Sequence, residues 1–130
     1  MGSQQLLLLI VGVIMVGLMI SVGIIMFGDN AAASNRDAIA NDLATYASRA
    51  QAYYHKPEFL DGGGNSFQGF TIAIGGSTVV NHNGTYSISS TSPTQTTIEG
   101  LGIELGYDQV TPVKVAVDVR VDSIFVTKLN

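Results

Sequence analysis

An uninterrupted apolar run at residues 6–27 constrains this chain more than any other feature of its sequence. The run, LLLLIVGVIMVGLMISVGIIMF, contains no charged residue and no proline. At a rise of about 1.5 Å per residue it makes roughly 33 Å of helix, which is enough to cross a bilayer core of about 30 Å. The run therefore predicts a helix that spans a membrane or packs against other apolar helices.

A cleavable secretory signal is the first alternative for this run. Such a signal has a basic stretch, an apolar core of about 7–15 residues and a cleavage site with small residues. Here no basic residue precedes the run, the run is longer than such a core, and FGDNAAAS after it is a poor cleavage site. We therefore expect the run to be retained, as a plain membrane anchor or as an assembly helix.

Small residues recur through the run and indicate close packing between helices. They are Gly12, Gly17, Ser21, Gly23 and Gly28. Gly17 and Ser21 lie one turn apart, a spacing that lets two helix backbones approach closely. Because a glycine costs a helix interior up to about 1 kcal/mol, a use for these residues is expected. We predict a packing face that consists of Leu6, Leu9, Val13, Gly17, Ser21 and Ile24.

Residues 1–28 are predicted to form the apolar half of a long helix, and residues 29–56 continue the helical pattern in amphipathic form. One apolar stripe, at steps of three and four residues, consists of Ile39, Leu43, Tyr46, Ala47, Ala50, Tyr53 and Tyr54. The charged residues Arg36, Asp37, Asp42 and Arg49 lie mostly off this stripe. Because a residue before proline avoids the α conformation, Pro57 places the helix end near His55. The alternative to one continuous helix is a joint at Gly28, with Asp29 capping a second helix.

The pattern changes after a glycine-rich linker at residues 57–68. Strand candidates occupy residues 69–74, 77–80, 85–90 and 96–105, and NHNG at residues 81–84 is typical of a hairpin turn. The strongest candidate, residues 113–129, begins with valines at every second position and polar residues between them, which predicts a sheet with one covered face. The fold class is therefore α+β, with a long helix packed under an antiparallel sheet of four to five strands in residues 69–130.

The composition excludes several classes of chemistry. The chain has no cysteine, a net charge of -4 and no basic cluster, so neither disulfides nor nucleic-acid binding are expected. His55 and His82 are isolated in sequence, and we expect no catalytic site, no metal and no cofactor. GLGIELG, at residues 100–106, lacks the surroundings of a dinucleotide fingerprint and indicates a β-bulge or a closely packed strand. Asn83 begins a glycosylation sequon, although the same residues also explain a tight turn.

The order of these segments resembles that of the type IV pilins. In that family a prepilin peptidase removes a short basic leader, an apolar helix begins at once, and its amphipathic continuation supports a small β-sheet. The resemblance covers about residues 4–54, and the sheet matches in kind only. It implies that Met1 is the mature N-terminus. It also implies that the subunit is inserted in the cytoplasmic membrane before assembly, and that the packing face then lies in the core of an extracellular filament.

Gln5 departs from the bacterial pattern. Bacterial type IV pilins carry a glutamate at this point of the mature helix, which pairs with the N-terminal amine of a neighbouring subunit. A neutral amide makes a weaker hydrogen bond than a carboxylate. Archaeal-type pilins and some divergent bacterial ones lack the glutamate, so both lineages are compatible with this sequence. Met1 and Gln5 are the expected N-terminal interface; a polar cap at the membrane surface is the alternative for Gln4 and Gln5.

The sequence thus predicts a structural subunit, similar to a major pilin, of a helical homopolymer at the cell surface. Its expected partners are its own copies, the pilus assembly machinery, the prepilin peptidase and, before assembly, the membrane. A minor pilin or a secretion pseudopilin is the alternative within the class. A monomeric, single-pass membrane-anchored binding domain is the alternative outside it. Adhesion, motility, DNA uptake and secretion all use similar subunits.

Overall fold

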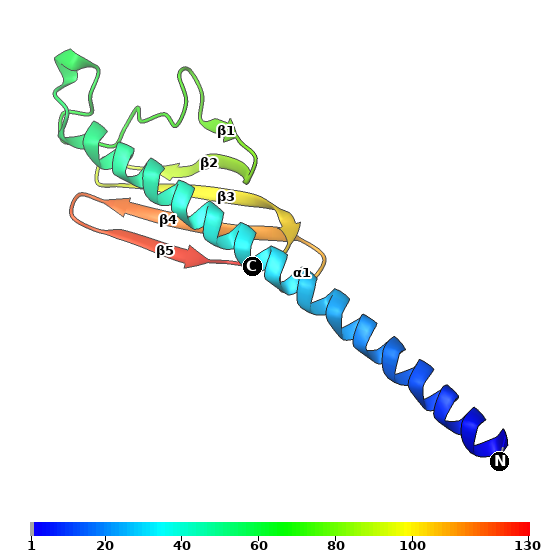
Figure 1. Ribbon diagram of the computed structural model, residues 1–130. Coiled ribbons are helices and arrows are strands. Elements are labelled where there is room, and N and C mark those ends of the chain that lie inside the picture. The colour runs from blue at the N-terminus through cyan, green and yellow to red at the C-terminus, as the bar shows by residue number, and fades with distance from the viewer. Residues whose placement is uncertain (1) are drawn as a thin grey trace. The chain divides into compact units, whose positions relative to one another are not determined.

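The computed structural model describes residues 2–130, which form one long helix, one short 3-10 helix and one antiparallel sheet (Figure 1). The helix α1 spans Gly2–His55, and the 3-10 helix η1 spans Glu58–Leu60. The strands are β1 (Thr78–Val80), β2 (Gly84–Thr91), β3 (Gln95–Leu105), β4 (Pro112–Arg120) and β5 (Ile124–Lys128), in spatial order β1-β2-β3-β4-β5. The predicted α+β class, with a long helix packed against the sheet, is confirmed.

The chain divides into two compact units, Met1–Ala31 and Ala32–Asn130. We refer to the second unit as the head. It contains the C-terminal part of α1, η1 and the whole sheet. The helix is continuous across Gly28, so the alternative of a joint capped by Asp29 is wrong.

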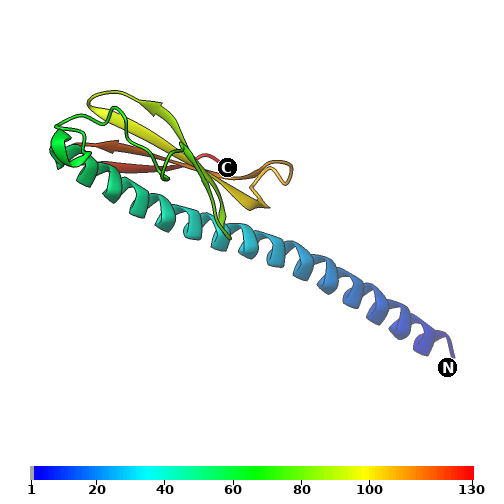
Figure 2. The same ribbon diagram turned by 90° about the horizontal axis from the view of Figure 1, so that it is seen from above.

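The core of the head lies between α1 and the sheet, as the two apolar patterns predict (Figure 2). On α1, the side chains of Ile39, Leu43, Ala47 and Ala50 are fully buried. The valines of β4 at positions 113, 115, 117 and 119 are fully buried against them, with Tyr86 of β2 and Ile98 of β3. On the other face of the sheet, Lys114 Nζ lies 3.1 Å from Glu99 Oε2, a cross-strand ion pair.

The GLGIELG segment lets the helix approach the sheet closely. A β-carbon on Gly100 would overlap the side chain of Ile39, and one on Gly102 would overlap Asn35 Oδ1 and Ile39. The pairing of β3 with β4 also shifts register between Leu101 and Leu105. The closely packed strand expected for this segment is therefore confirmed, and the pairing register within it is irregular.

The linker at residues 57–68 forms backbone hydrogen bonds with the C-terminal end of α1. Backbone amides of Gly63, Gly64 and Asn65 donate to the carbonyl groups of Tyr53, Lys56 and Tyr54, at 2.8–2.9 Å. These bonds satisfy carbonyl groups that the end of a helix leaves without partners. The helix ends at His55, as predicted from Pro57.

Two strand expectations are wrong. Residues 69–74 form no strand, and the segment contains only an isolated bridge between Ala73 and Gly76. Gly69 and Gly75 have positive φ angles, which interrupt an extended chain, although Phe70 and Ile72 are buried in the core. The candidate at residues 113–129 is two strands, β4 and β5, because the chain reverses where Arg120 N donates to Ser123 O.

Arg36 and Asp42 are more enclosed than their place off the apolar stripe predicts. Arg36 is 2% exposed. Asp42 is half-buried, and its Oδ2 accepts hydrogen bonds from Tyr86 Oη and from the side-chain amides of Asn81 and Asn83. Burial alone raises the pKa of Asp42, but these three hydrogen bonds outweigh it and leave the pKa below the ordinary value. Burial and the bond to Asp42 raise the pKa of Tyr86.

We expect Gly100→Ala to lower the free energy of unfolding of the head by about 1–3 kcal/mol, because the added methyl group meets Ile39 in a filled core. Urea unfolding of the full chain in detergent micelles measures the change. Gly76→Ala is the matched control, since the nearest atom to a β-carbon there is 3.9 Å away. Equal effects of the two substitutions would contradict the close approach of helix and sheet at Gly100.

We expect Asp42→Asn to lower the melting temperature at pH 7 and to lose this effect at acidic pH. The folded pKa of Asp42 lies below its ordinary value of 3.8, so the carboxylate stabilises the head above that pH. This contribution is lost as the pH falls below about 4 and through the folded pKa. Thermal unfolding between pH 2 and 7 tests this, with the exposed Asp122→Asn as control. A pH-independent difference would contradict the role of the charge.

Candidate membrane and assembly helix

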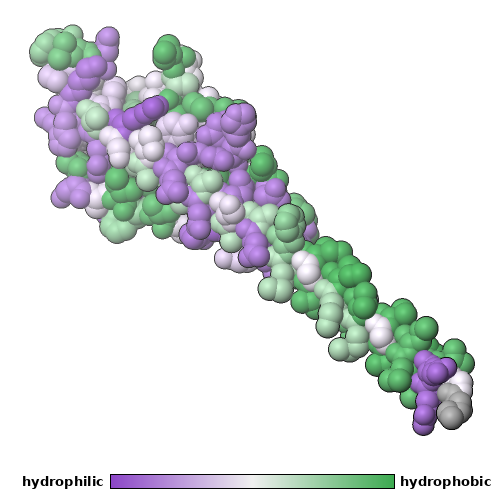
Figure 3. Space-filling view, in the orientation of Figure 1, coloured by the Kyte–Doolittle hydropathy of each residue, from purple (hydrophilic) through white to green (hydrophobic). Residues whose placement is uncertain are grey.

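The apolar run occupies the part of α1 that belongs to the first unit. Its large apolar side chains are all exposed, from Met15 at 49% to Phe27 at 76%. Figure 3 shows a nearly continuous hydrophobic surface along this segment and a mixed surface on the head. By length and composition the helix is able to cross a membrane, and none of its most apolar window is buried. Within residues 2–130, nothing covers this surface.

The six residues of the predicted packing face share one side of this helix. With about 100° of rotation per residue, they fall within an arc of roughly 120°. Ser21 Oγ donates to the carbonyl oxygen of Gly17 at 2.9 Å. Because the hydroxyl hydrogen is bonded inside the helix, the face presents no unpaired donor to an apolar neighbour. Whether this face contacts other copies stays a prediction.

The glycines of the apolar part of α1 face open space rather than a close neighbour within residues 2–130. A β-carbon on Gly12, Gly17, Gly23 or Gly28 would meet no atom within 4 Å. In this they differ from Gly100 and Gly102, where the packing of the head leaves no space for a side chain. Their cost to helix stability is therefore not offset by any contact within residues 2–130.

A hollow that the sequence reasoning missed lies on the opposite side of the helix. It has a volume of about 340 Å³ and is lined by Met15, Leu18, Met19, Val22, Gly23 and Met26. Methionine side chains adapt readily to the shape of a partner. The sequence signal that could have indicated this hollow is the set of methionines that lie around Gly23 on one side of the helix. The run thus has two different apolar faces.

The predicted N-terminal interface lies partly outside the described residues. Met1 is not among them, and Gln5 is exposed near the start of α1. The first turn of the helix carries no acidic side chain. The amide of Gln5 is therefore one of the few polar side chains that this end of the helix presents, together with Ser3 and Gln4.

Asn83 of the sequon connects the hairpin between β1 and β2 to α1. Its Nδ2, the atom that would carry a glycan, donates to Asp42 Oδ2 at 2.8 Å, and its backbone oxygen accepts from Asn35 Nδ2 at 2.9 Å. The predicted turn is present, since Asn81 N donates to Gly84 O at 2.9 Å. Glycosylation of Asn83 stays a prediction, and it would have to displace or share the bond to Asp42.

The part of the chain that the structure describes contains no cluster of metal-ligating side chains. His55 lies at the end of α1 and His82 in the exposed hairpin turn. Among residues 2–130, no group of three or more His, Cys, Asp or Glu side chains is placed to hold a metal ion. A hollow of about 190 Å³ on the outer face of the sheet contains the Glu99–Lys114 pair, whose charges offset one another.

No known protein family, curated protein sequence or solved structure matches this chain. The chain has one long apolar N-terminal helix, which is compatible with a membrane-spanning helix or with a pilin-like helix. The functional argument therefore depends on the residues and on their geometry.

We expect Val16→Arg, at the centre of the run, to lower the fraction of the chain that membranes retain. A charged side chain at the centre of a spanning helix costs about 2.5–3.5 kcal/mol, and no other span is present in residues 2–130. Alkaline extraction of membranes, followed by immunoblotting, measures the retained fraction. Asn30→Arg, outside the run, serves as the control. Full retention of the Val16→Arg chain would contradict a spanning role.

Proposed function

We propose that this protein is a structural subunit of a type IV pilus-like filament at the cell surface. Before assembly, the subunit is inserted in the cytoplasmic membrane through residues 6–27. During assembly, these residues leave the lipid and bundle with the same residues of other copies. The head then forms the outer part of the fibre. Adhesion, motility, DNA uptake and secretion are all compatible with this role.

One observation carries the proposal, namely the different surroundings of the two parts of α1. From Ile39 to Ala50 the apolar stripe is fully covered by the sheet, whereas the large side chains of residues 6–27 are all exposed. One continuous helix therefore has an apolar part that the sheet covers and an apolar part that nothing covers within residues 2–130. This difference supports a protein in which the uncovered part contacts another apolar helix or lipid. The glycines that face open space support the first of these.

The two faces of the run also support a polymer. Moving a helix from lipid to a protein bundle gains little hydrophobic energy, because both surroundings are apolar. The driving force is therefore close packing repeated between many neighbours. A helical polymer needs two different contact patches on each subunit, whereas a closed dimer uses one patch twice. The packing face and the methionine-lined hollow are two such patches.

The assembly partners follow from the proposed class. A prepilin peptidase would process the precursor of the subunit, and the pilus assembly machinery would extract the subunit from the membrane. Met1 and Gln5 would then contact a neighbouring subunit, through an amide in place of a carboxylate. A minor pilin or a secretion pseudopilin would use the same geometry in fewer copies.

The alternative outside the class is a monomeric membrane-anchored binding domain. In that case residues 6–27 stay in lipid, and the head acts alone. The two proposals differ in one property: an anchor has no use for small residues on its surface, whereas a bundle does. Substitutions at these residues therefore distinguish them.

We expect Gly17→Leu to abolish filaments while leaving membrane insertion intact, because a large side chain separates helices that pack at this position. Cells that express the chain are sheared, and the supernatant is imaged by negative-stain electron microscopy. Alkaline extraction measures insertion in parallel. Ile14→Phe, which also enlarges a side chain but lies between the packing face and the methionine-lined hollow, is the control.

The outcomes separate the packing role from the function. If the Gly17→Leu chain formed normal filaments, Gly17 would have no packing role in assembly. Absence of any filament from the unsubstituted chain would overturn the proposed function and favour the monomeric anchor.

A further inference from the structure

Polar side chains of α1 form an unusual cluster where the helix enters the head. Asn35, Arg36 and Asp37 follow one another, and together they contact β3, β5, the turn between β1 and β2, and the chain end. We refer to these three residues as the latch. All of them belong to the head unit, which begins at Ala32.

Asn35 joins α1 to two separate parts of the sheet. The residue is 8% exposed. Its Nδ2 donates to the carbonyl oxygen of Asn83, at the turn before β2, at 2.9 Å. Its Oδ1 accepts from the backbone amides of Ile103 at 3.1 Å and Glu104 at 3.4 Å, in β3. Both the nitrogen and the oxygen of this buried side-chain amide are therefore hydrogen-bonded. Removal of the side chain leaves buried backbone groups without partners.

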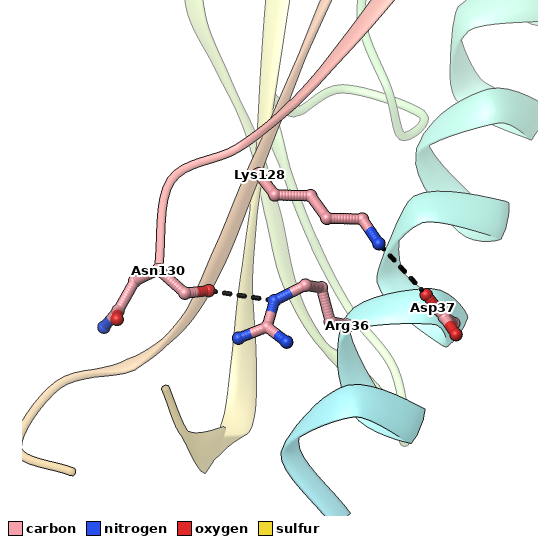
Figure 4. Close-up of polar contacts among 4 residues, drawn as sticks. All are labelled: Arg36, Asp37, Lys128 and Asn130. Carbon is pink, nitrogen blue, oxygen red and sulfur yellow. Dashed lines mark hydrogen bonds and ion pairs between the residues drawn. The ribbon is translucent and has the colours of Figure 1, made fainter. Parts of the chain in front are cut away.

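Arg36 and Asp37 hold the C-terminal part of the chain against the same turn of the helix (Figure 4). Arg36 Nε donates to the backbone oxygen of Asn130 at 3.1 Å, and its guanidinium lies over the ring of Tyr107, 4.0 Å from the centroid. Its Nη2 is buried without a partner among the described residues. Lys128 Nζ lies 3.3 Å from Asp37 Oδ1.

The rest of the interface between helix and sheet consists mainly of apolar side chains. Contacts between alanine, leucine and valine surfaces are not directional, so they allow an element to slide with a gradual loss of burial. Hydrogen bonds weaken steeply when distance or angle changes. The latch bonds therefore fix the position of α1 along its own axis more sharply than the core contacts do. Asp42 adds three further directional bonds two turns along.

Tension on residues 6–27 reaches the head through the chain just before Ala32. The latch residues are the first polar contacts that such a force meets. We propose that the latch holds the axial register of α1 on the sheet under tension, so that a pull on the apolar helix does not draw it out of the head. The source of the tension rests on the proposed function, in which a filament loads its subunits through their helices.

Force measurements on the single full-length chain in detergent micelles test this role. The chain has no cysteine, so Asn30→Cys and Asp122→Cys give two unique attachment points. The second lies near the far end of α1, because Gln51 Nε2 donates to Arg120 O at 3.1 Å. Pulling between them loads the interface along the helix axis. The measured quantity is the rate of unfolding at a fixed force.

We expect Asn35→Ala to raise this rate by at least roughly tenfold. Asn41→Ala makes the same chemical change at an exposed position of the same helix, and we expect it to leave the rate within about twofold. Val119→Ala lowers the equilibrium stability from the far end of the core, and we expect it to raise the rate by less than Asn35→Ala does. If Asn35→Ala does not fold, Lys128→Met replaces it, with an expected rise of roughly threefold.

The result that overturns the proposal is a rate for the latch variant no higher than that of Asn41→Ala, or rates that simply follow equilibrium stability across the variants. Because no filament takes part in the measurement, this failure leaves the proposed function standing. If the force response is as expected but the unsubstituted chain forms no filaments, the proposed function is wrong and the role of the latch still holds.

Discussion

The burial of one apolar stripe of α1 against the valine face of β4 is the contact on which the head depends. Ile39, Leu43, Ala47 and Ala50 are small or branched side chains without polar atoms, and they face valines at alternate positions of the strand. Neither surface is stable in water without the other. Gly100 and Gly102 bring the two surfaces close enough for this burial to be complete. The polar contacts of Asn35 and Asp42 then determine where along the sheet the helix lies.

The two parts of α1 differ in what covers their apolar side chains. In the head, the apolar side of the helix is covered by a sheet of the same chain, and the polar side faces solvent. Along residues 6–27, all sides are apolar, so no single covering layer of this chain would be sufficient. A surrounding medium, either lipid or several other helices, is the only type of cover that fits such a surface. This difference is the physical basis of the proposed function.

The parts of the fold that follow from simple periodicity could be predicted from sequence. The apolar stripe of α1 and the valine face repeat a regular pattern. The helix end at His55 and the hairpin at Asn81 follow instead from the local signals of Pro57 and of the NHNG segment. Residues 69–74 also show apolar alternation, but Gly69 and Gly75 adopt positive φ angles and turn the segment into a loop. The reversal after Arg120 was missed because valine and charged residues continue beyond it to Asp122.

The burial of Asn35 and Arg36 was missed for a different reason. Arg36 was assigned to the positions off the apolar stripe, although Asn35 and Arg36 lie four and three residues before Ile39, at the spacing of the stripe. Polar side chains at the positions of an apolar stripe are usually interpreted as the end of that stripe. Here their partners come from residues 83, 103 and 130, which are far away in sequence and invisible to a local pattern. For the packing face, the residues could be chosen from their spacing, but no contact within residues 2–130 tests that choice.

The hydrogen bond from Ser21 to Gly17 has a consequence for the reversibility of transfer between surroundings. Since the hydroxyl keeps its partner in either environment, no polar group must be dehydrated or rehydrated when the segment changes from one to the other. The free-energy difference between the two states then reduces to how well the shapes fit. In the proposed function, such a subunit would pass between the bilayer and the fibre without breaking this hydrogen bond.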